Sequence, residues 1–229
     1  MNTKSLTKEA VAGMIDHTNL KATATRADIE KLCEEAKTYH FASVMVNSAY
    51  TSLCRDLVKG SGVLVGTVAG FPLGQMSAAA KVFEAETAIA DGADEIDYVV
   101  NVADVKDGRW NLVKEEMEKI IAACHSRGAG CKVIFENCYL TKEEIVRLAE
   151  IAKEVKPDFI KTSTGFGTGG ATAEDVRLMK ETVGGAVRVK AAGGIRNWAS
   201  CREMIEAGAE RIGASAGKLI LDEFTPEQK

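Results

Sequence analysis

The chain has 229 residues, of which 46% are hydrophobic and 27% charged, and its formal net charge is −4. This balance is typical of a folded globular protein and excludes an intrinsically disordered one. Because basic residues are not in surplus, we expect no nucleic-acid partner, and any phosphate-binding site must be built locally.

Short apolar segments rich in valine and isoleucine recur along the chain and predict β-strands with helical segments between them. In chain order, the eight predicted strands are residues 14–18, 43–47, 63–71, 95–101, 131–137, 158–163, 187–194 and 211–215. Between the fifth and the sixth strand, Ile145, Leu148 and Ala152 recur at the spacing of one helical face, which predicts a helix within residues 141–156.

Signals at helix ends support the same alternation. Thr25, Thr141 and Thr172 each stand three residues before an acidic residue, an arrangement that predicts a capping box at the start of a helix. Glycine ends two predicted helices in the similar stretches ADGADEID (90–97) and EAGAERIG (206–213), where an acidic residue then leads into a strand. The similarity of these two stretches indicates a repeated β–α unit.

Strands that alternate with helices and are apolar on both faces are typical of parallel sheets. Eight such units within about 200 residues predict an α/β protein with a single (β/α)8 barrel, or TIM barrel, preceded by a short N-terminal helix. An open, doubly wound sheet is the alternative. No linker or change of composition marks a boundary, so we expect residues 1–229 to form one domain.

Charged residues interrupt several predicted strands near their carboxyl ends, which face the active-site mouth in parallel barrels. They are Asp16, Asp97, Glu136, Lys161 and Lys190. A structural interpretation is open for the acids, since Asp16 could cap a helix and the other two could pair with the lysines in an ion network. Two lysines on adjacent predicted strands are harder to explain in this way, because like charges repel and lysine is rarely buried without a partner.

An imine-forming site would explain the two lysines. Lysine attacks a carbonyl only as the neutral amine, and its reference pKa of about 10.4 falls when the amine is buried beside a second cation. One lysine would then be the nucleophile and the other the cation that lowers its pKa, while Asp97 would move protons during imine formation. The residues alone leave this chemistry and a structural ion network open.

Stretches of glycine and other small residues follow the last three predicted strands. They are TGFGTGG (164–170), AAGGIRN (191–197) and GASAGK (213–218), each placed between a strand and the start of a helix. Backbone amides at helix N-termini favour anions, and the loops after the seventh and eighth strands of a barrel often bind phosphate. With Arg196 and Lys218 beside them, these stretches predict a phosphate site, whereas the lack of a G-x-G-x-x-G or Walker A pattern argues against a nucleotide.

The sequence contains no pattern for a metal or a cofactor. The three histidines, His17, His40 and His125, stand in unlike contexts without metal-ligand spacing, and the six cysteines form no C-x-x-C motif. We therefore expect free thiols, no metal and no cofactor. The N-terminal stretch lacks the apolar segment of a secretory signal, and no run approaches about 18 apolar residues, so we expect a cytoplasmic protein without a membrane partner.

Six stretches together resemble the deoxyribose-phosphate aldolases, a family of class I, Schiff-base-forming aldolases. They are IDHTNLKATAT (15–25), GFPLG (70–74), GADEIDYVVN (92–101), DFIKTSTGFGTGGAT (158–172), VKAAGGIR (189–196) and GASAG (213–217). These stretches span nearly the whole chain in the family's order. The resemblance implies a TIM barrel without metal or cofactor that reversibly cleaves a phosphosugar, 2-deoxy-D-ribose 5-phosphate, to D-glyceraldehyde 3-phosphate and acetaldehyde through a lysine Schiff base.

The resemblance also implies roles for individual residues. Lys161 would form the Schiff base, and Lys190 would be the second, activating lysine. Asp97 would relay protons, and Asp16 would support that relay or bind the substrate hydroxyl. The substrate and its phosphate would be bound by Thr164, Gly167, Thr168, Gly193, Gly194, Gly213 and Ser215. A homodimer is the assembly that such barrels suggest.

The chain departs from the family's common pattern at Asn137, Ala214 and Met45, where members often have threonine, threonine and cysteine. These differences concern substrate positioning and phosphate affinity rather than the type of reaction.

Two other functions stay open. One is another imine-forming barrel aldolase with a different donor, which a donor screen would separate. The other is a non-catalytic phosphosugar-binding barrel, which would form no trappable imine.

Overall fold

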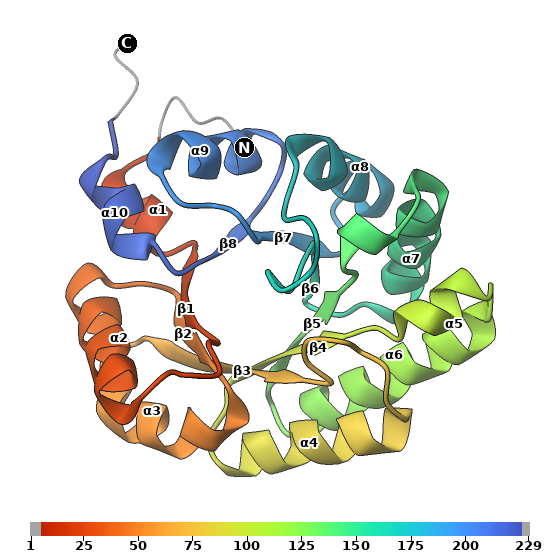
Figure 1. Cartoon of the computed structure of the whole chain (residues 1–229), viewed down its shortest axis with the longest axis horizontal. Helices are drawn as coiled ribbons and strands as arrows, with labels where there is room; N and C mark the ends of the chain where they lie inside the picture. Colours follow the sequence, from red (N-terminus) through yellow and green to blue (C-terminus); the bar gives the residue numbers. More distant parts are fainter. Residues whose placement is uncertain (1–5, 226–229) are drawn as a thin grey trace.

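Eight parallel strands close into a barrel in the computed structural model, which describes residues 6–225 (Figure 1). The strands pair in chain order, and the last pairs with the first. They are β1 (Ile15–Asn19), β2 (Ser43–Val46), β3 (Leu64–Ala69), β4 (Glu95–Val99), β5 (Gly130–Ile134), β6 (Phe159–Lys161), β7 (Arg188–Ala192) and β8 (Arg211–Ala214). The predicted (β/α)8 barrel is therefore confirmed, and the open sheet is excluded.

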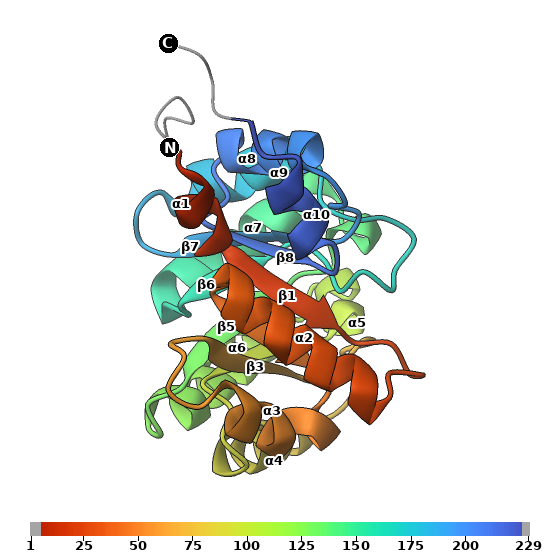
Figure 2. The ribbon, with the colours of Figure 1, turned by 90° about the vertical axis from the view of Figure 1, so that its left-hand side faces the viewer.

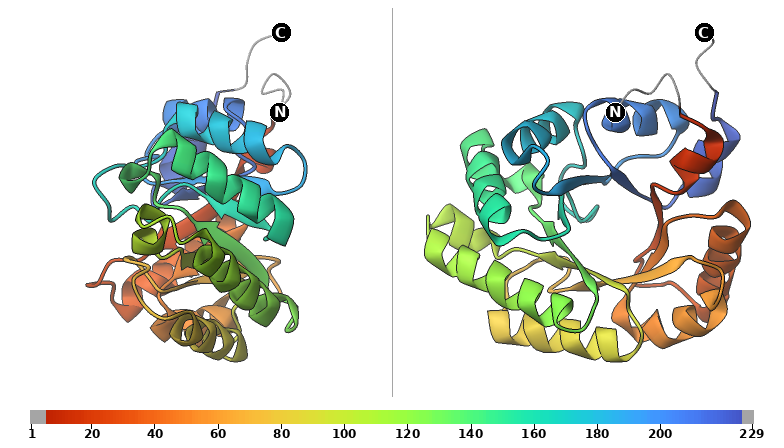
Figure 3. Two further views of the ribbon diagram at one scale, coloured as in Figure 1. Left: turned by 90° about the vertical axis from the view of Figure 1, so that its right-hand side faces the viewer. Right: turned by 180° about the vertical axis from the view of Figure 1, so that it is seen from behind.

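Helices surround the ring of strands, as the side and rear views show (Figures 2 and 3). They are α1 (Lys8–Ala12), α2 (Arg26–Tyr39), α3 (Thr51–Val58), α4 (Ala78–Ala90), α5 (Val102–Lys106), α6 (Trp110–His125), α7 (Lys142–Val155), α8 (Ala173–Val183), α9 (Trp198–Glu206) and α10 (Gly217–Asp222), with short 3₁₀ turns η2 (Ser48–Tyr50) and η3 (Asn137–Tyr139). The predicted N-terminal helix is α1, which contacts α10. None of the helices within residues 6–225 has the length and apolar character needed to cross a membrane.

The threonines predicted to start helices do so. Thr25 begins α2 with a capping box, in which Thr25 N donates to Asp28 Oδ2 at 2.8 Å and Asp28 N donates to Thr25 Oγ1 at 3.3 Å. The same box recurs at the start of α7. At α8, Thr172 accepts the amide of Asp175, but the Asp175 carboxylate binds Lys142 Nζ at 2.5 Å. This third box is half formed because Lys142 offers the acid a charged partner.

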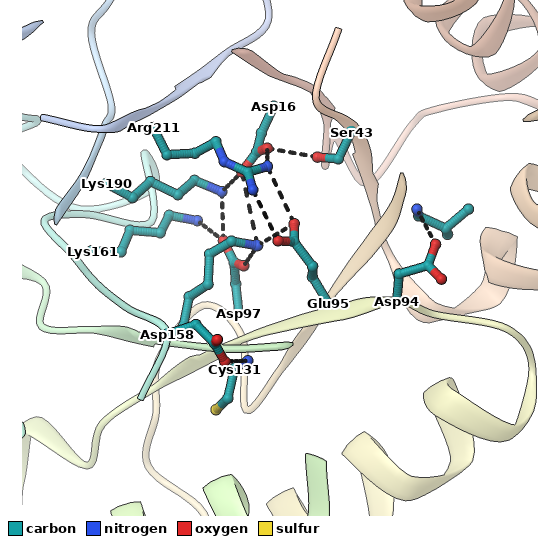
Figure 4. Close-up of polar contacts among 12 residues, drawn as sticks. Asp16, Ser43, Asp94, Glu95, Asp97, Cys131, Asp158, Lys161, Lys190 and Arg211 are labelled. Atoms are coloured by element: carbon teal, nitrogen blue, oxygen red, sulfur yellow. Dashed lines mark hydrogen bonds and ion pairs between the residues drawn. The ribbon is translucent and has the colours of Figure 1, made fainter. Parts of the chain in front are cut away.

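Acidic residues just before β4, β6 and β8 bind backbone amides of the preceding strand. Asp94 Oδ2 accepts from Val65 N at 2.8 Å, and Asp158 Oδ2 accepts from Cys131 N at 2.9 Å (Figure 4). Glu210 holds the corresponding place before β8 and accepts from the β7 backbone at 3.4 Å. The two similar sequence stretches therefore share a structural role, since each supplies the acid that binds the neighbouring strand.

Left-handed backbone conformations end three strands earlier than the sequence predicts. Gly70 has a φ of 61° after β3, Gly193 has a φ of 90° after β7, and Glu136 has a φ of 57° after β5. Glycine adopts this conformation without a steric penalty, whereas it is uncommon for glutamate. The chain leaves the sheet at these points and starts the loops that form the barrel mouth.

The two faces of the sheet differ in chemistry. Side chains such as Ile96 and Val133 point toward the helices and belong to the main apolar core. Inside the barrel, Met45, Leu20 and Val68 form a small separate apolar cluster. The inner face of β4 to β8 instead carries buried charges, so these strands are fully apolar only on their outer face.

Candidate active site

Charged side chains from six strands meet inside the barrel, and we call them the interior charge cluster. They are Asp16 (β1), Glu95 and Asp97 (β4), Lys132 (β5), Lys161 (β6), Lys190 (β7) and Arg211 (β8), each at most 8% exposed. Strand register explains the meeting, because Lys161 pairs with Lys190 across β6 and β7, and Asp97 pairs with Lys132 across β4 and β5. Side chains of paired residues point to the same face of a sheet.

Asp97 lies at the centre of the cluster and is fully buried (Figure 4). Its Oδ2 atom accepts from Lys161 Nζ at 2.8 Å and from Lys190 Nζ at 2.7 Å. Its Oδ1 atom accepts from Lys132 Nζ at 2.9 Å. One carboxylate oxygen therefore joins the two lysines that the sequence singled out.

Asp16 supports Lys190 from the opposite side. The Asp16 carboxylate forms an ion pair with Lys190, and its Oδ1 atom accepts from Arg211 Nη1 at 2.6 Å and from Ser43 Oγ at 2.7 Å. Lys190 is thus held between two carboxylates, those of Asp16 and Asp97. The structure brings together the four predicted residues of this group, while their catalytic roles stay predictions.

Sequence reasoning missed three of the seven cluster residues, Glu95, Lys132 and Arg211. Lys132 Nζ donates to Glu95 Oε2 at 2.7 Å, and Arg211 Nη2 donates to Glu95 Oε1 at 3.0 Å. A signal was present, because Lys132 stands alone within the apolar run of β5 and Glu95 stands two residues before Asp97, on the same face. Glu95 is the first residue of β4 and Lys132 the middle residue of β5, so neither stands at the carboxyl end of its strand.

The balance of charge in the cluster singles out Lys161. Counted by residue type, the four cations Lys132, Lys161, Lys190 and Arg211 face the three carboxylates of Asp16, Glu95 and Asp97. Burial lowers the pKa of Lys161 to about 8; the charge of Asp97 opposes this shift, and the charges of Lys190 and Lys132 add to it. Loss of a proton from Lys161 leaves the cluster neutral, and a neutral amine is the nucleophilic form.

The other shifted groups keep their charges. Burial alone would raise the pKa of Asp97, but the charges of Lys132, Lys161 and Lys190 outweigh it and hold the pKa well below its usual range. The pKa of Asp16 is lowered for the same reason, chiefly by Lys190. Burial works against the charge of Lys132, yet the nearby carboxylates, Asp97 first among them, raise its pKa above the usual value. Among these shifted groups, Lys161 is therefore the one whose pKa shift favours the neutral form.

A cavity of about 740 Å³ opens over the cluster at the carboxyl ends of the strands. Of the seven cluster residues, Lys161 is the one that borders it. Five of the seven residues predicted to bind the substrate also line it: Thr164, Gly193, Gly194, Gly213 and Ser215. Lys161 and most of the predicted binding residues thus face one space.

A second cavity of about 290 Å³ adjoins the first across Thr164 and Phe166, which border both. Gly167 and Glu136 line this second cavity and not the larger one. Thr168 lies in the described part of the loop and borders neither of the two cavities. The predicted phosphate contacts of Gly167 and Thr168 therefore stay predictions that the shape of the larger cavity does not support.

Close approach explains two of the glycines. A Cβ atom on Gly213 would lie 2.9 Å from Ala192 Cβ and 3.2 Å from Lys190 Cε, so glycine leaves room for the buried lysine. A Cβ atom on Gly193 would lie 3.0 Å from Gly170 Cα, so the loops after β6 and β7 touch through their backbones. These glycines would shape the cavity in addition to any contact with phosphate.

The structure also shows what surrounds the other residues that the sequence singled out. Glu136 does not join the ion network that the sequence left open for it, since its carboxylate binds Thr164 instead. Met45 belongs to the small apolar cluster, and Asn137 Nδ2 lies 3.4 Å from Met179 Sδ. All six cysteines are free thiols. Within residues 6–225, no three His, Cys, Asp or Glu side chains are arranged to hold a metal ion.

A (β/α)8 barrel with buried groups of shifted pKa beneath a cavity at its mouth defines a barrel enzyme. The sequence pattern of the DeoC/LacD family aldolases matches residues 10–223, and the chain belongs to that family. The protein is therefore an aldolase, a carbon–carbon lyase.

Individual relatives are similar over nearly the whole chain. A deoxyribose-phosphate aldolase of Lactobacillus acidophilus is 56% identical over 214 residues, which are 93% of this chain and 90% of that protein. One of Thermococcus gammatolerans is 52% identical over 214 residues, which are 93% and 95% of the two chains. The tetrameric structure of deoxyribose phosphate aldolase from Aeropyrum pernix has a TM-score of 0.88 at 32% identity and covers 94% of this chain and 91% of that one.

Proposed function

We propose that this aldolase reversibly cleaves 2-deoxy-D-ribose 5-phosphate to D-glyceraldehyde 3-phosphate and acetaldehyde through an imine on Lys161. One observation carries the proposal: Lys161 is the one of the seven cluster residues that borders the cavity, and burial lowers its pKa to about 8. The names of the relatives support the choice of substrate.

The reaction would run through five steps. The neutral Lys161 amine adds to the C1 aldehyde, and the carbinolamine loses water to give an iminium ion. A base removes the proton of the C3 hydroxyl, the C2–C3 bond breaks, and its electron pair enters the iminium to give an enamine. Glyceraldehyde 3-phosphate leaves with carbons 3 to 5. The enamine takes a proton at C2, and water hydrolyses the resulting iminium to acetaldehyde, which restores the amine.

The cluster would manage the protons of these steps. Lys161 and Lys190 both donate to Asp97 Oδ2, so that one oxygen atom can pass a proton between them. The Lys190 ammonium would protonate the departing hydroxyl, with Asp97 holding it in place and Asp16 as its second support. The very low pKa of Asp97 favours a role as a fixed anion and transient relay over that of a proton store.

Trapping with borohydride tests the proposal directly. Acetaldehyde should form an imine with Lys161, and borohydride should reduce the carbon–nitrogen double bond to leave an ethyl group on that nitrogen. Peptide mass spectrometry should find the ethyl group on Lys161. An adduct on another lysine would overturn the assignment, and its absence with every aldehyde and ketone donor would favour a non-catalytic phosphosugar-binding barrel. Trapping by other donors but not acetaldehyde would indicate a different aldolase.

The phosphate of the substrate should contribute strongly to kcat/KM. Hydrogen bonds to a charged group contribute about 1.5–3 kcal/mol each, so two or more lost contacts predict a decrease of about 100-fold or more for unphosphorylated 2-deoxy-D-ribose. Steady-state kinetics with both sugars checks this, with the borohydride adduct of acetaldehyde, which carries no phosphate, as the control. Equal values of kcat/KM for the two sugars would show that the glycine loops do not bind the substrate's phosphate.

The proposal also covers location and assembly. A cytoplasmic enzyme is in keeping with the free thiols of all six cysteines. We infer a homo-oligomer with a dimer as its smallest form, supported by the assembly of the Aeropyrum pernix relative, whose structure is described as tetrameric.

A further inference from the structure

Glu136 has a backbone conformation that its position in the fold does not explain. It follows β5 with φ 57° and ψ 61°, and it is only 2% exposed. The other described non-glycine residues with positive φ are His40 and Lys156, and each lies at the C-terminal end of a helix, where this conformation is common. Glu136 follows a strand, so the surrounding structure must hold it there.

The buried carboxylate of Glu136 binds one residue of the next loop. It accepts a hydrogen bond from Thr164 N at 3.1 Å and a short one from Thr164 Oγ1. Thr164 Oγ1 in turn accepts from Phe166 N at 3.0 Å. Among the described residues, no lysine, arginine or histidine forms an ion pair with Glu136. A buried carboxylate needs hydrogen-bond donors, and the amide and hydroxyl of Thr164 supply the main ones, with Cys138 Sγ a weak donor to Glu136 Oε1 at 3.9 Å.

This contact holds the beginning of the loop 164–170, which starts three residues after Lys161. Thr164 and Phe166 both border the larger cavity beside Lys161. The end of the loop is held separately, since Ala171 N donates to Gly193 O at 3.0 Å. Gly193 also lines the larger cavity, so the loop connects two parts of the same wall.

The middle of the loop rests on the same glutamate. A Cβ atom on Gly167 would lie 3.2 Å from Glu136 Cδ and 2.7 Å from Cys138 Sγ. Glycine at position 167 therefore lets the loop approach both Cys138 and Glu136 closely. This packing accounts for a residue that the sequence suggested as a phosphate contact but that does not border the larger cavity.

We propose that Glu136 is a positioning residue, which acts through Thr164 to fix the loop 164–170 as the wall of the cavity that receives the substrate's phosphate end. The inference rests on the proposed function, because it assigns a task to that same site. Glu136 does not border the larger cavity, so it acts on the substrate through the loop and not by contact.

The test compares two substrates for variants of Glu136. Glu136→Ala should lower kcat/KM for 2-deoxy-D-ribose 5-phosphate by about tenfold or more, and that for unphosphorylated 2-deoxy-D-ribose by less than about threefold. Glu136→Gln keeps one acceptor oxygen and should lose less than the alanine variant. Glu150→Gln, a change on the exposed face of α7, is the matched control and should leave kcat/KM for both substrates unchanged. Borohydride adducts with acetaldehyde count the active sites in each preparation.

A double-mutant cycle tests whether Thr164 transmits the effect. Thr164→Val removes the hydroxyl that binds Glu136. The loss of kcat/KM in the double variant with Glu136→Gln, expressed as a free energy, should therefore be smaller than the sum of the losses in the two single variants. Additive losses, or equal losses for both substrates per active site, would overturn the inference. If Glu136→Ala does not fold, the glutamine and valine variants carry the test alone. Failure of the adduct in the unchanged protein would instead contradict the proposed function.

Discussion

Lys161→Met is expected to lower kcat by at least about four orders of magnitude, because the chain then lacks the amine that forms the covalent intermediate. Methionine is apolar and of similar length, and it leaves three cations facing three carboxylates in the cluster. Asp97 keeps its bonds from Lys190 and Lys132. We therefore expect the variant to fold with an unchanged or higher Tm. Release of glyceraldehyde 3-phosphate, measured with a coupled dehydrogenase, gives the rate.

The matched control for this change is Lys59→Met, which removes an exposed lysine at the end of α3. It should retain full activity and an acetaldehyde adduct on Lys161. If Lys161→Met retained more than about one per cent of the activity, with the adduct on another lysine, the nucleophile would have been assigned to the wrong strand.

Lys190→Met should shift the dependence of the rate on pH to more alkaline values. Lys190 shares an oxygen of Asp97 with Lys161, and its charge helps lower the pKa of Lys161 to about 8. Without it, the cluster is neutral when Lys161 is protonated, so the pKa of Lys161 should rise above 8, although burial, the largest cause of its low value, remains. Near pH 7.5, kcat/KM should fall because less of the amine is neutral, by up to about tenfold for each increase of one in that pKa.

The sign of the pH dependence separates this effect from a loss of folding. In the unchanged protein, kcat/KM should rise with pH to a plateau above about pH 9, because Lys161 is neutral above its pKa of about 8. In Lys190→Met the midpoint of this rise should lie at a higher pH, so kcat/KM should still be rising where the unchanged protein has reached its plateau. Any difference in kcat/KM between the variant and the unchanged protein that remains at high pH, where Lys161 is neutral in both, measures the contribution of Lys190 to proton transfer. An unchanged midpoint near pH 8 would show that Lys190 does not set the pKa of Lys161.

Lys190→Arg offers a control that retains the charge. A guanidinium group at this position should keep the midpoint of the pH profile near that of the unchanged protein, although its different shape will lower the plateau. The three profiles together distinguish the charge of Lys190 from its capacity to give up a proton, since arginine stays protonated throughout the range.

Much of the fold could be predicted because its signals are local. The apolar runs marked all eight strands, and threonine followed by an acid marked the starts of α2, α7 and α8. Strand ends were less certain, since a left-handed conformation at Glu136 has no sequence signal of the kind that glycine provides. The acid before β6 was also missed as a repeat, because PDFI does not resemble the stretches before β4 and β8.

The sequence by itself determined eight strands that alternate with helices, and it singled out four of the seven charged residues at their centre, because a charge stands out within an apolar strand. Only the tertiary structure decided how those charges balance. Barrel closure brings Asp16 to within 2.6 Å of Arg211 across 195 residues of sequence, and it places Glu95 and Lys132 beneath them. Electrostatic energy depends on distance and burial, so the choice of Lys161 as the proton-losing amine exists only in the closed barrel.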